Sequence, residues 1–147
     1  MAAERRAQTT WEGDLASGSG TLTGASGAIG PQAVSWAART EEPGGNTSPE
    51  ELLAAAHSSC FSMALSGALA RAGTPPRRLE TEAVVTFDKL EGGWKITRSA
   101  LSVRGDVPGA DEQTFREAAE DARDNCPVSQ ALIGNVELSV HAELAGS

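Results

Sequence analysis

The sequence contains no tyrosine, and aromatic residues make up only 4% of its 147 positions. Hydrophobic residues reach 39%, while glycine occurs 16 times. This composition predicts many turns and a modest core. We therefore expect a single domain over residues 1–147, in which residues 1–6 form a frayed tail.

Basic residues are also few. The chain has 12 lysines and arginines against 20 aspartates and glutamates, which gives a net charge of −8. A protein that binds nucleic acid concentrates Lys and Arg against the phosphates. The charge balance therefore argues against a nucleic-acid partner and is more typical of a role in solubility.

Cysteine is scarce as well, and the two residues of this type are Cys60 and Cys126. The first ten residues, MAAERRAQTT, are polar and lack the apolar segment of a secretory signal. We therefore expect a cytoplasmic location. In that reducing compartment a pair of thiols is more often redox-active than structural.

Residues 48–73 have the features of one long helix. Ser48 can cap its start, Pro49 suits the first helical position, and Glu51 completes an S-x-x-E capping box. Gly73 follows the last turn, and two prolines soon after it prevent the helix from continuing.

This helix carries no formal charge between Leu52 and Ala70. Because no wide face is left for water, we expect a buried helix. One small sheet covers only one side of it, which suggests that a second copy of the chain covers the other. We expect no membrane span, because His57, four serines and many alanines make the segment weakly hydrophobic.

Alternating segments separated by glycine-rich turns predict β-strands on both sides of the helix. The expected strands are 9–14, 17–24 and 32–40 before a linker at 41–47, and 79–90, 94–105 and 135–144 later in the chain. A surface helix is expected at 111–125 and a short helical turn at 127–134. The segregated order βββ–α–ββ–α–β favours an α+β fold with antiparallel sheets.

The two cysteines each admit two interpretations. Cys60 lies among serines in the apolar helix, where it is either a small core residue or a reactive thiol. Cys126 falls between a helix and Pro127, where the backbone can shift. Such a position suits a thiol that approaches another sulfur, although an inert loop cysteine fits equally well.

Other chemistry has weaker support. His57 precedes Cys60 by three residues, so it lies on nearly the same helix face and either acts as a base or simply packs or hydrogen-bonds. A zinc site could also be considered, with His57, Cys60, Cys126 and His141 as its ligands. The spacing of these residues matches no standard ligand pattern. No phosphate-binding glycine motif and no Ser-His-Asp pattern is present, so we expect neither a metal nor a cofactor.

Three blocks of sequence resemble one family. SPEELLAAAHSSCFSMAL at 48–65, NCPVSQAL at 125–132 and the opening WEGDLASGSGTL at 11–22 are similar to the OsmC/Ohr family, and specifically to its OsmC branch. The resemblance implies a thiol-dependent peroxidase that prefers organic hydroperoxides. It also implies an intertwined homodimer of α+β fold, in which antiparallel sheets wrap around central cysteine-bearing helices.

The resemblance assigns roles to four residues. Cys60 looks like the peroxidatic thiol and Cys126 like the resolving thiol. Glu50 matches the catalytic carboxylate of the family, and Arg39 looks like its guanidinium partner. In the Ohr branch the arginine comes earlier, and this chain has no arginine between Arg6 and Arg39.

These residue types suit peroxide reduction. A thiolate attacks the peroxide and becomes a sulfenic acid, and a second thiol converts the sulfenic acid to a disulfide. An arginine lowers the pKa of a buried thiol, and a carboxylate can hold that arginine through a bidentate pair. Apolar walls at Leu52, Phe61 and Met63 would favour an alkyl hydroperoxide. The family resemblance implies a dithiol reductant such as a dihydrolipoyl group.

The spacing of Glu50 and Cys60 carries a geometric consequence. Ten residues of straight helix separate two positions by ~15 Å and by about 80° around the axis. The two side chains therefore cannot meet within one helix, and we expect Glu50 to come from the partner chain. Two helices crossing antiparallel near residues 54–56 would form such sites at the dimer interface, where small alanines permit close approach.

Two other functions remain open at the level of sequence. One is a non-catalytic dimeric binding protein for lipid-like ligands, in which the thiols are bystanders. The other is a general disulfide reductase, which the absence of a C-x-x-C motif disfavours.

Overall fold

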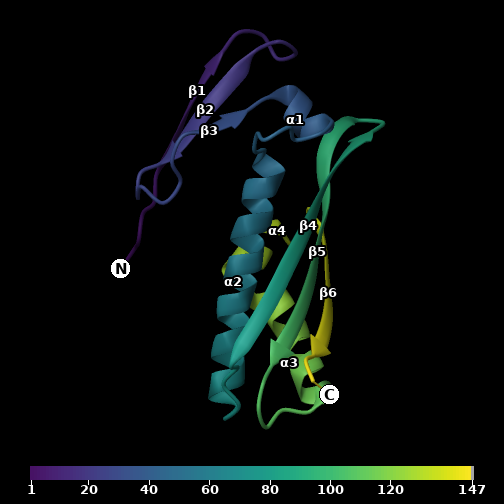
Figure 1. Cartoon of the computed structure of the whole chain (residues 1–147). Helices are drawn as coiled ribbons and strands as arrows, with labels where there is room; N and C mark the ends of the chain where they lie inside the picture. Colours follow the sequence, from purple (N-terminus) through teal and green to yellow (C-terminus); the bar gives the residue numbers. More distant parts are fainter. Residues whose placement is uncertain (147) are drawn as a thin grey trace. The chain divides into compact units, whose positions relative to one another are not determined.

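The computed structural model describes residues 1–146 of the chain. Its contacts divide into two compact units, Met1–Leu52 and the part that begins at Leu53 (Figure 1). The boundary falls in the first turn of the long helix α2 (Pro49–Arg71). The expectation of a single domain stays a prediction.

The first unit contains a three-stranded antiparallel sheet of β1 (Ala7–Glu12), β2 (Ser19–Gly24) and β3 (Gln32–Val34). This is the meander predicted from the glycine-rich turns. The strands pair in chain order, so that β2 lies in the middle. Every residue of β1 is exposed within the chain.

The end of the third predicted strand is wrong. Residues 32–34 pair as expected, but the next segment forms the short helix α1 (Trp36–Thr40). Ser35 caps this helix, because its hydroxyl accepts a hydrogen bond from the backbone N–H of Ala38 at 3.1 Å. The alternation of apolar and polar residues was too short to distinguish a strand from one capped helical turn.

The second unit contains a three-stranded sheet of β4 (Arg78–Leu90), β5 (Gly93–Asp106) and β6 (Glu137–Leu144). Strands β4 and β5 form the expected antiparallel hairpin, with a register shift at Thr86/Phe87. Helices α3 (Glu112–Asn125) and α4 (Pro127–Leu132) connect β5 to β6 (Figure 1). All of these elements lie within a few residues of their predicted bounds.

The expectation of purely antiparallel sheets is wrong for one pair of strands. β6 runs parallel to β5, with Arg98 opposite Glu137 and Gly105 opposite Leu144. Two helices separate these strands in the sequence. This long connection brings the chain back to the end of the sheet where β5 begins, so that β6 can run in the same direction. The α+β class is confirmed, but the second sheet is mixed.

Helix α2 uses one stripe of residues to contact this sheet. His57, Phe61, Leu65 and Leu69 recur every four residues and are completely buried. They pack with a core to which β5, β6 and α3 contribute, including Leu101, Val103, Ala142 and Phe115. One sheet therefore covers one side of the helix, as the composition suggested.

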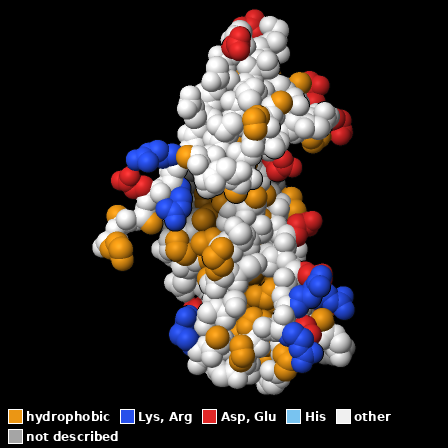
Figure 2. All heavy atoms as spheres, turned by 60° about the vertical axis from the view of Figure 1, so that its left-hand side comes forward, with side chains coloured by type: hydrophobic (Ala, Val, Ile, Leu, Met, Phe, Trp, Pro, Cys, Tyr) orange, Lys and Arg blue, Asp and Glu red, His pale blue; other side chains and the backbone are white. Residues whose placement is uncertain are grey.

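The other side of α2 carries exposed residues. Met63 is 73% exposed, and Ala55, Ala56 and Ser59 are also exposed. Figure 2 brings this side forward and shows hydrophobic side chains at the surface. The sheet, α3 and α4 pack against one face of the helix, and the expectation that a second copy covers the other face stays a prediction.

By length and composition α2 could also cross a membrane, and 22% of the relevant window is buried inside the chain. Core helices meet the same criterion. The buried stripe of α2 includes His57, whose ring binds hydroxyls of two other elements. The absence of a membrane span stays the expectation.

Candidate active site

The second unit places the two cysteines next to each other. Cys60 lies in the middle of α2 and is half-buried, whereas Cys126 is completely buried between α3 and α4. Cys126 caps α4, and Pro127 occupies the first helical position. Both thiols are free. The bend between α3 and α4 thus presents one sulfur to the other.

The surroundings of Cys60 oppose its ionisation. Burial raises the pKa of the Cys60 thiol, and a hydrogen bond from the backbone N–H of Val128 acts in the opposite direction. The adjacent Cys126 thiol raises the pKa further, through its charge and its hydrogen bond. The net result is a thiol that is less acidic than a free cysteine.

A buried row of hydrogen bonds extends from Cys126 into the core. The Sγ of Cys126 lies 3.1 Å from the Oγ of Ser129, whose backbone N–H donates to the same sulfur at 3.3 Å. Ser129 Oγ lies 2.8 Å from Nε2 of His57, and Nδ1 of the same ring lies 2.6 Å from Ser99 Oγ. All four side chains are completely buried.

This environment lowers the pKa of His57, because burial disfavours the imidazolium form. The ring is therefore neutral near pH 7, with one nitrogen as donor and the other as acceptor. The sequence had singled out His57 as either a base or a packing residue. The structure shows the packed and hydrogen-bonded alternative, and it places the ring two hydrogen bonds away from the Cys126 sulfur.

Ser99 and Ser129 were missed at the level of sequence. Ser129 follows Cys126 by three residues, which is the spacing of a cap and its helix, so the CPVS block contained a signal. Ser99 lies in a strand of mixed polarity and had no comparable signal. Only the packing of α2 on β5 brings it to the histidine.

The first unit contains the predicted ion pair. Nε of Arg39 lies 2.8 Å from one Glu50 oxygen and 3.1 Å from the other. The side chain of Glu50 is 9% exposed and that of Arg39 is 29% exposed. Nε of Arg39 thus reaches both carboxylate oxygens, so the predicted pairing of Arg39 with Glu50 is present.

An apolar hollow adjoins this pair within the first unit. The guanidinium of Arg39 lies over the ring of Trp36, 5.9 Å from its centroid. A cavity of about 180 Å³ is bordered by this tryptophan, Trp11, Leu15, Val34 and Pro49, with Arg39 at its edge. Two indole rings and a charged group thus surround a small space.

The apolar walls predicted from the sequence are only partly available. Met63 is exposed and Leu52 is half-buried, so both can face a ligand. Phe61 is completely buried in the core between α2 and the sheet, so its proposed place in a substrate wall is wrong. It occurs on the i, i+4 stripe that packs on the sheet.

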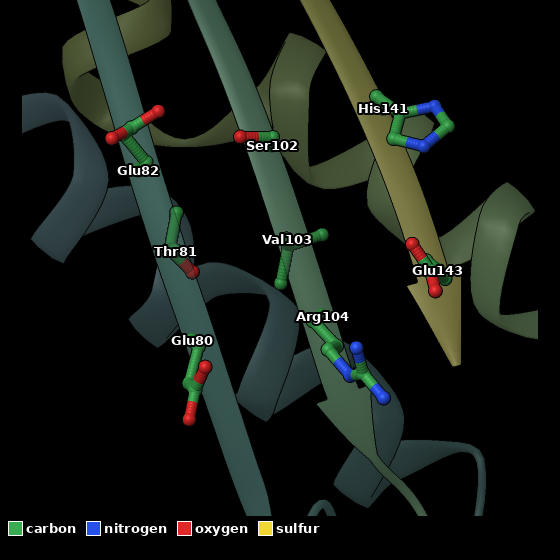
Figure 3. A pocket seen from close by; sticks show the side chains of 8 residues that line it. All are labelled: Glu80, Thr81, Glu82, Ser102, Val103, Arg104, His141 and Glu143. Carbon is green, nitrogen blue, oxygen red and sulfur yellow. The ribbon is translucent and has the colours of Figure 1, made fainter. Parts of the chain in front are cut away.

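Another hollow, of about 350 Å³, lies on the outer face of the second sheet (Figure 3). Its labelled side chains include Glu80, Glu82, Ser102, Arg104, His141 and Glu143. The strand register places Arg104 between Glu80 and Glu143. Alternating charges of this kind are typical of a solvated sheet face, and the hollow contains neither cysteine.

No group of three His, Cys, Asp or Glu side chains that could hold a metal ion occurs among the residues that the structure describes. The zinc site considered from Cys60, Cys126, His57 and His141 is not assembled there. His141 belongs instead to the outer face of β6.

Comparisons with known proteins agree on one family. The family model described as OsmC-like protein matches residues 42–141. Peroxiredoxin OsmC of Escherichia coli is 42% identical over 138 residues, which cover 94% of this chain and 96% of that protein. An organic hydroperoxide resistance protein of Xanthomonas axonopodis is 29% identical over 98 residues, covering 66% of this chain and 67% of that protein.

Solved structures show the same architecture. The organic hydroperoxide resistance protein OhrB of Bacillus subtilis superposes with a TM-score of 0.72 at 28% identity, covering 94% of this chain and 98% of that one. An OsmC-like protein of Mycoplasma pneumoniae gives a TM-score of 0.74 at 14% identity, covering 98% and 99%. The second likeness concerns the fold alone.

Proposed function

Because the chain belongs to the OsmC-like protein family, as its sequence blocks suggested, we propose that it is a cysteine-based peroxidase that reduces organic hydroperoxides to alcohols in defence against oxidative stress. In this proposal Cys60 is the peroxidatic thiol and Cys126 the resolving thiol. The observation that carries it is that two free thiols lie side by side in the second unit, although 66 positions separate them in the sequence.

 The cysteines are distant in the sequence, and it is the packing of α2 against α4 that brings them together.

The proposed chemistry proceeds in three balanced steps. The Cys60 thiolate attacks the terminal oxygen of R–O–OH, the O–O bond breaks, and the alkoxide takes up a proton and leaves as ROH. Cys60 is now a sulfenic acid. The Cys126 sulfur attacks it, which forms a disulfide and releases water. A dithiol reductant, such as a dihydrolipoyl group, then restores both thiols and is itself oxidised to a disulfide.

Activation of Cys60 requires a positive charge, because burial and Cys126 raise the pKa of the thiol. We assign this role to the Arg39–Glu50 pair of a second copy of the chain. Two facts support a second copy: α2 runs unbroken from Pro49 to Arg71, and ten residues of straight helix correspond to ~15 Å. Glu50 and Cys60 of one helix therefore lie too far apart to share a site.

A homodimer is also supported by the uncovered side of α2. Its exposed residues include Ala55, Ala56 and Met63, which are apolar and lie on one continuous helix. Burial of such a face against an identical helix would remove apolar surface from water. The alanines would allow the two helices to cross closely.

The hollow beside Trp11 and Trp36 supports an organic substrate. Indole rings offer apolar surface to an alkyl or aryl group, while Arg39 at the edge can orient the polar peroxide end. Hydrogen peroxide has no apolar group to fill such a space. We also propose a cytoplasmic location, because the reductant would be a dithiol of that compartment.

The test is turnover of cumene hydroperoxide and of hydrogen peroxide with a dithiol as electron donor. We expect the organic peroxide to be the better substrate. Cys60→Ser should abolish turnover, and Cys126→Ser should let the protein accumulate a Cys60 sulfenic acid, visible as a gain of one oxygen in the intact mass. Full activity of Cys60→Ser would mean that Cys60 is not the peroxidatic thiol, and absence of turnover in the wild type would favour the non-catalytic binding protein.

A further inference from the structure

The reaction described above leaves one buried titratable residue without a role. His57 is completely enclosed in the core, on the same stripe of α2 as Phe61. A polar ring in such a place costs free energy unless both nitrogens are hydrogen-bonded. Both are, and one of the two partners, Ser129, also contacts the Cys126 sulfur.

The three contacts form a continuous path. Ser99 Oγ lies 2.6 Å from Nδ1 of His57, and Ser129 Oγ lies 2.8 Å from Nε2. The same Ser129 oxygen lies 3.1 Å from the sulfur of Cys126. Four elements, β5, α2, α4 and the α3–α4 bend, each contribute one side chain. Every gap is within hydrogen-bonding reach.

We propose that Ser129 and His57 form a proton relay for the resolving step, in which Ser129 takes the proton of the Cys126 thiol and passes its own to His57. Ser129 is then a catalytic residue, because it touches the reacting sulfur. His57 acts through Ser129 and is a positioning residue. This inference rests on the proposed role of Cys126 as the resolving thiol.

The hydrogen-bonding directions fit this path. With the Nδ1–H tautomer of His57, the Cys126 S–H can donate to Ser129 Oγ, the Ser129 O–H can donate to Nε2, and Nδ1–H can donate to Ser99 Oγ. When the proton moves, the Ser129 hydroxyl still has one donor and one acceptor neighbour. The resulting thiolate accepts hydrogen bonds from both the hydroxyl and the backbone N–H of Ser129.

The step balances without any added reagent. The Cys126 thiolate attacks the sulfur of the Cys60 sulfenic acid, an S–S bond forms and the S–O bond breaks. The oxygen leaves with the bonding pair as hydroxide and takes up one proton, which the relay returns, so that water is released. In the net reaction, the Cys60 sulfenic acid and the Cys126 thiol give the Cys60–Cys126 disulfide and one molecule of water.

Burial supports the acceptor role of the ring. Because burial lowers the pKa of His57, the ring is neutral near pH 7 and its acceptor nitrogen is available. The imidazolium that forms is unfavourable in the core, which favours rapid return of the proton to the leaving hydroxide.

The experiment separates oxidation from resolution in single turnovers. Reduced protein is mixed with cumene hydroperoxide and quenched at intervals, and intact mass distinguishes the thiol, the sulfenic acid trapped by dimedone and the disulfide. Ser129→Ala should leave the oxidation of Cys60 within about twofold of the wild type and slow disulfide formation by about tenfold or more. His57→Gln should do the same.

Two further variants distinguish chemistry from packing. Ser129→Thr keeps the hydroxyl and should restore disulfide formation to within a few-fold. Ser62→Ala is the matched control, since its hydroxyl on α2 bonds to Thr81 and not to the relay. If Ser129→Ala does not fold, Ser99→Ala, which removes the far end of the row, should slow resolution with oxidation unchanged.

The outcomes are distinct from those that test the proposed function. Equal rates of disulfide formation in the wild type and in Ser129→Ala would overturn the relay, as would equal slowing of oxidation and resolution. If no sulfenic acid can be trapped at Cys60 even in Cys126→Ser, the proposed function itself fails, whatever the behaviour of Ser129.

Discussion

At Cys60 the chain's own groups act against the reaction. Burial is the largest of them, and the hydrogen bond from Val128 only partly offsets it. The thiolate is the reactive form, and each unit by which the pKa lies above the ambient pH lowers the thiolate fraction about tenfold. The proposed reaction at Cys60 therefore requires a guanidinium that lowers the pKa of this thiol again.

The first prediction concerns that guanidinium. Arg39→Gln should lower the rate of Cys60 oxidation at pH 7 by about tenfold or more, because the thiol keeps its raised pKa. The rate in the variant should then rise as pH increases towards the pKa of the thiol, which partly restores activity. Stopped-flow oxidation with cumene hydroperoxide between pH 6 and pH 10 measures both effects.

The matched control is Arg77→Gln, because Arg77 is 71% exposed and pairs with an exposed aspartate at 3.5 Å. It should follow the wild-type profile. Identical pH profiles for Arg39→Gln and the wild type would mean that Arg39 does not activate the thiol.

A second prediction at this scale concerns stability. The pKa of His57 is lowered in the folded chain, so below its ordinary value of about 6.5 the unfolded chain binds a proton that the folded chain does not. This contribution to the free energy of unfolding is present above about pH 6.5 and is lost as pH falls through the lower folded-state pKa.

Urea unfolding at several values between pH 5 and pH 7.5 tests this. The wild type should lose stability as pH falls, and His57→Gln should show a shallower dependence. His141→Gln is the control, because His141 is exposed on the outer face of β6. If the free energy of unfolding of His57→Gln depends on pH as steeply as that of the wild type, the pH dependence does not come from His57.

At the scale of elements, some features could be predicted from sequence because the signal was local. The start of α2 was marked by Ser48 and Pro49, and the Ser48 hydroxyl does accept from the backbone N–H of Glu51 at 3.1 Å. β6 was marked by strict alternation. Its direction depends on how two helices fold back on the sheet, which no local pattern contains.

The candidate site also contains residues that a local sequence signal identifies and residues that only tertiary packing brings together. The two cysteines and the Arg39–Glu50 pair could be found from motifs. The hydrogen bonds of His57 could not, because Ser99 lies 42 positions away and only tertiary packing brings it to the ring. Helix α1 was missed because five residues are too few for a periodicity to show.

Close packing between β5 and α3 gives a prediction at this scale. A Cβ at Gly105 would lie 2.6 and 2.8 Å from ring atoms of Phe115, which is itself completely buried. Gly105→Ala should therefore lower the free energy of unfolding by about 1–3 kcal/mol, because the ring has no room to move. Urea unfolding measures the change.

Gly92 provides the comparison for that measurement. It lies in the turn between β4 and β5, and a Cβ there meets nothing within 4 Å. Gly92→Ala should change the free energy of unfolding by less than about 0.5 kcal/mol. Equal effects at the two glycines would mean that the contact with Phe115 is not tight.

At the scale of the whole molecule, the proposed activation of Cys60 requires a second chain. One chain contains both thiols in its second unit and the ion pair in its first, and the length of α2 separates Glu50 from Cys60. The uncovered apolar side of the same helix offers a surface for a second copy. Catalysis and dimerisation would then depend on one element.

Complementation between two inactive variants tests this claim most directly. Cys60→Ser and Arg39→Gln chains, carrying different tags, are co-expressed, and hydroperoxide turnover is measured on the mixed dimers and on each variant alone. A mixed dimer has one site with an intact Cys60 and an intact Arg39 from the other chain. Random pairing should therefore restore about a quarter of wild-type activity, and purified mixed dimers about half. If the mixed dimers are as inactive as the separate variants, the site is not shared between chains, and the central claim is wrong.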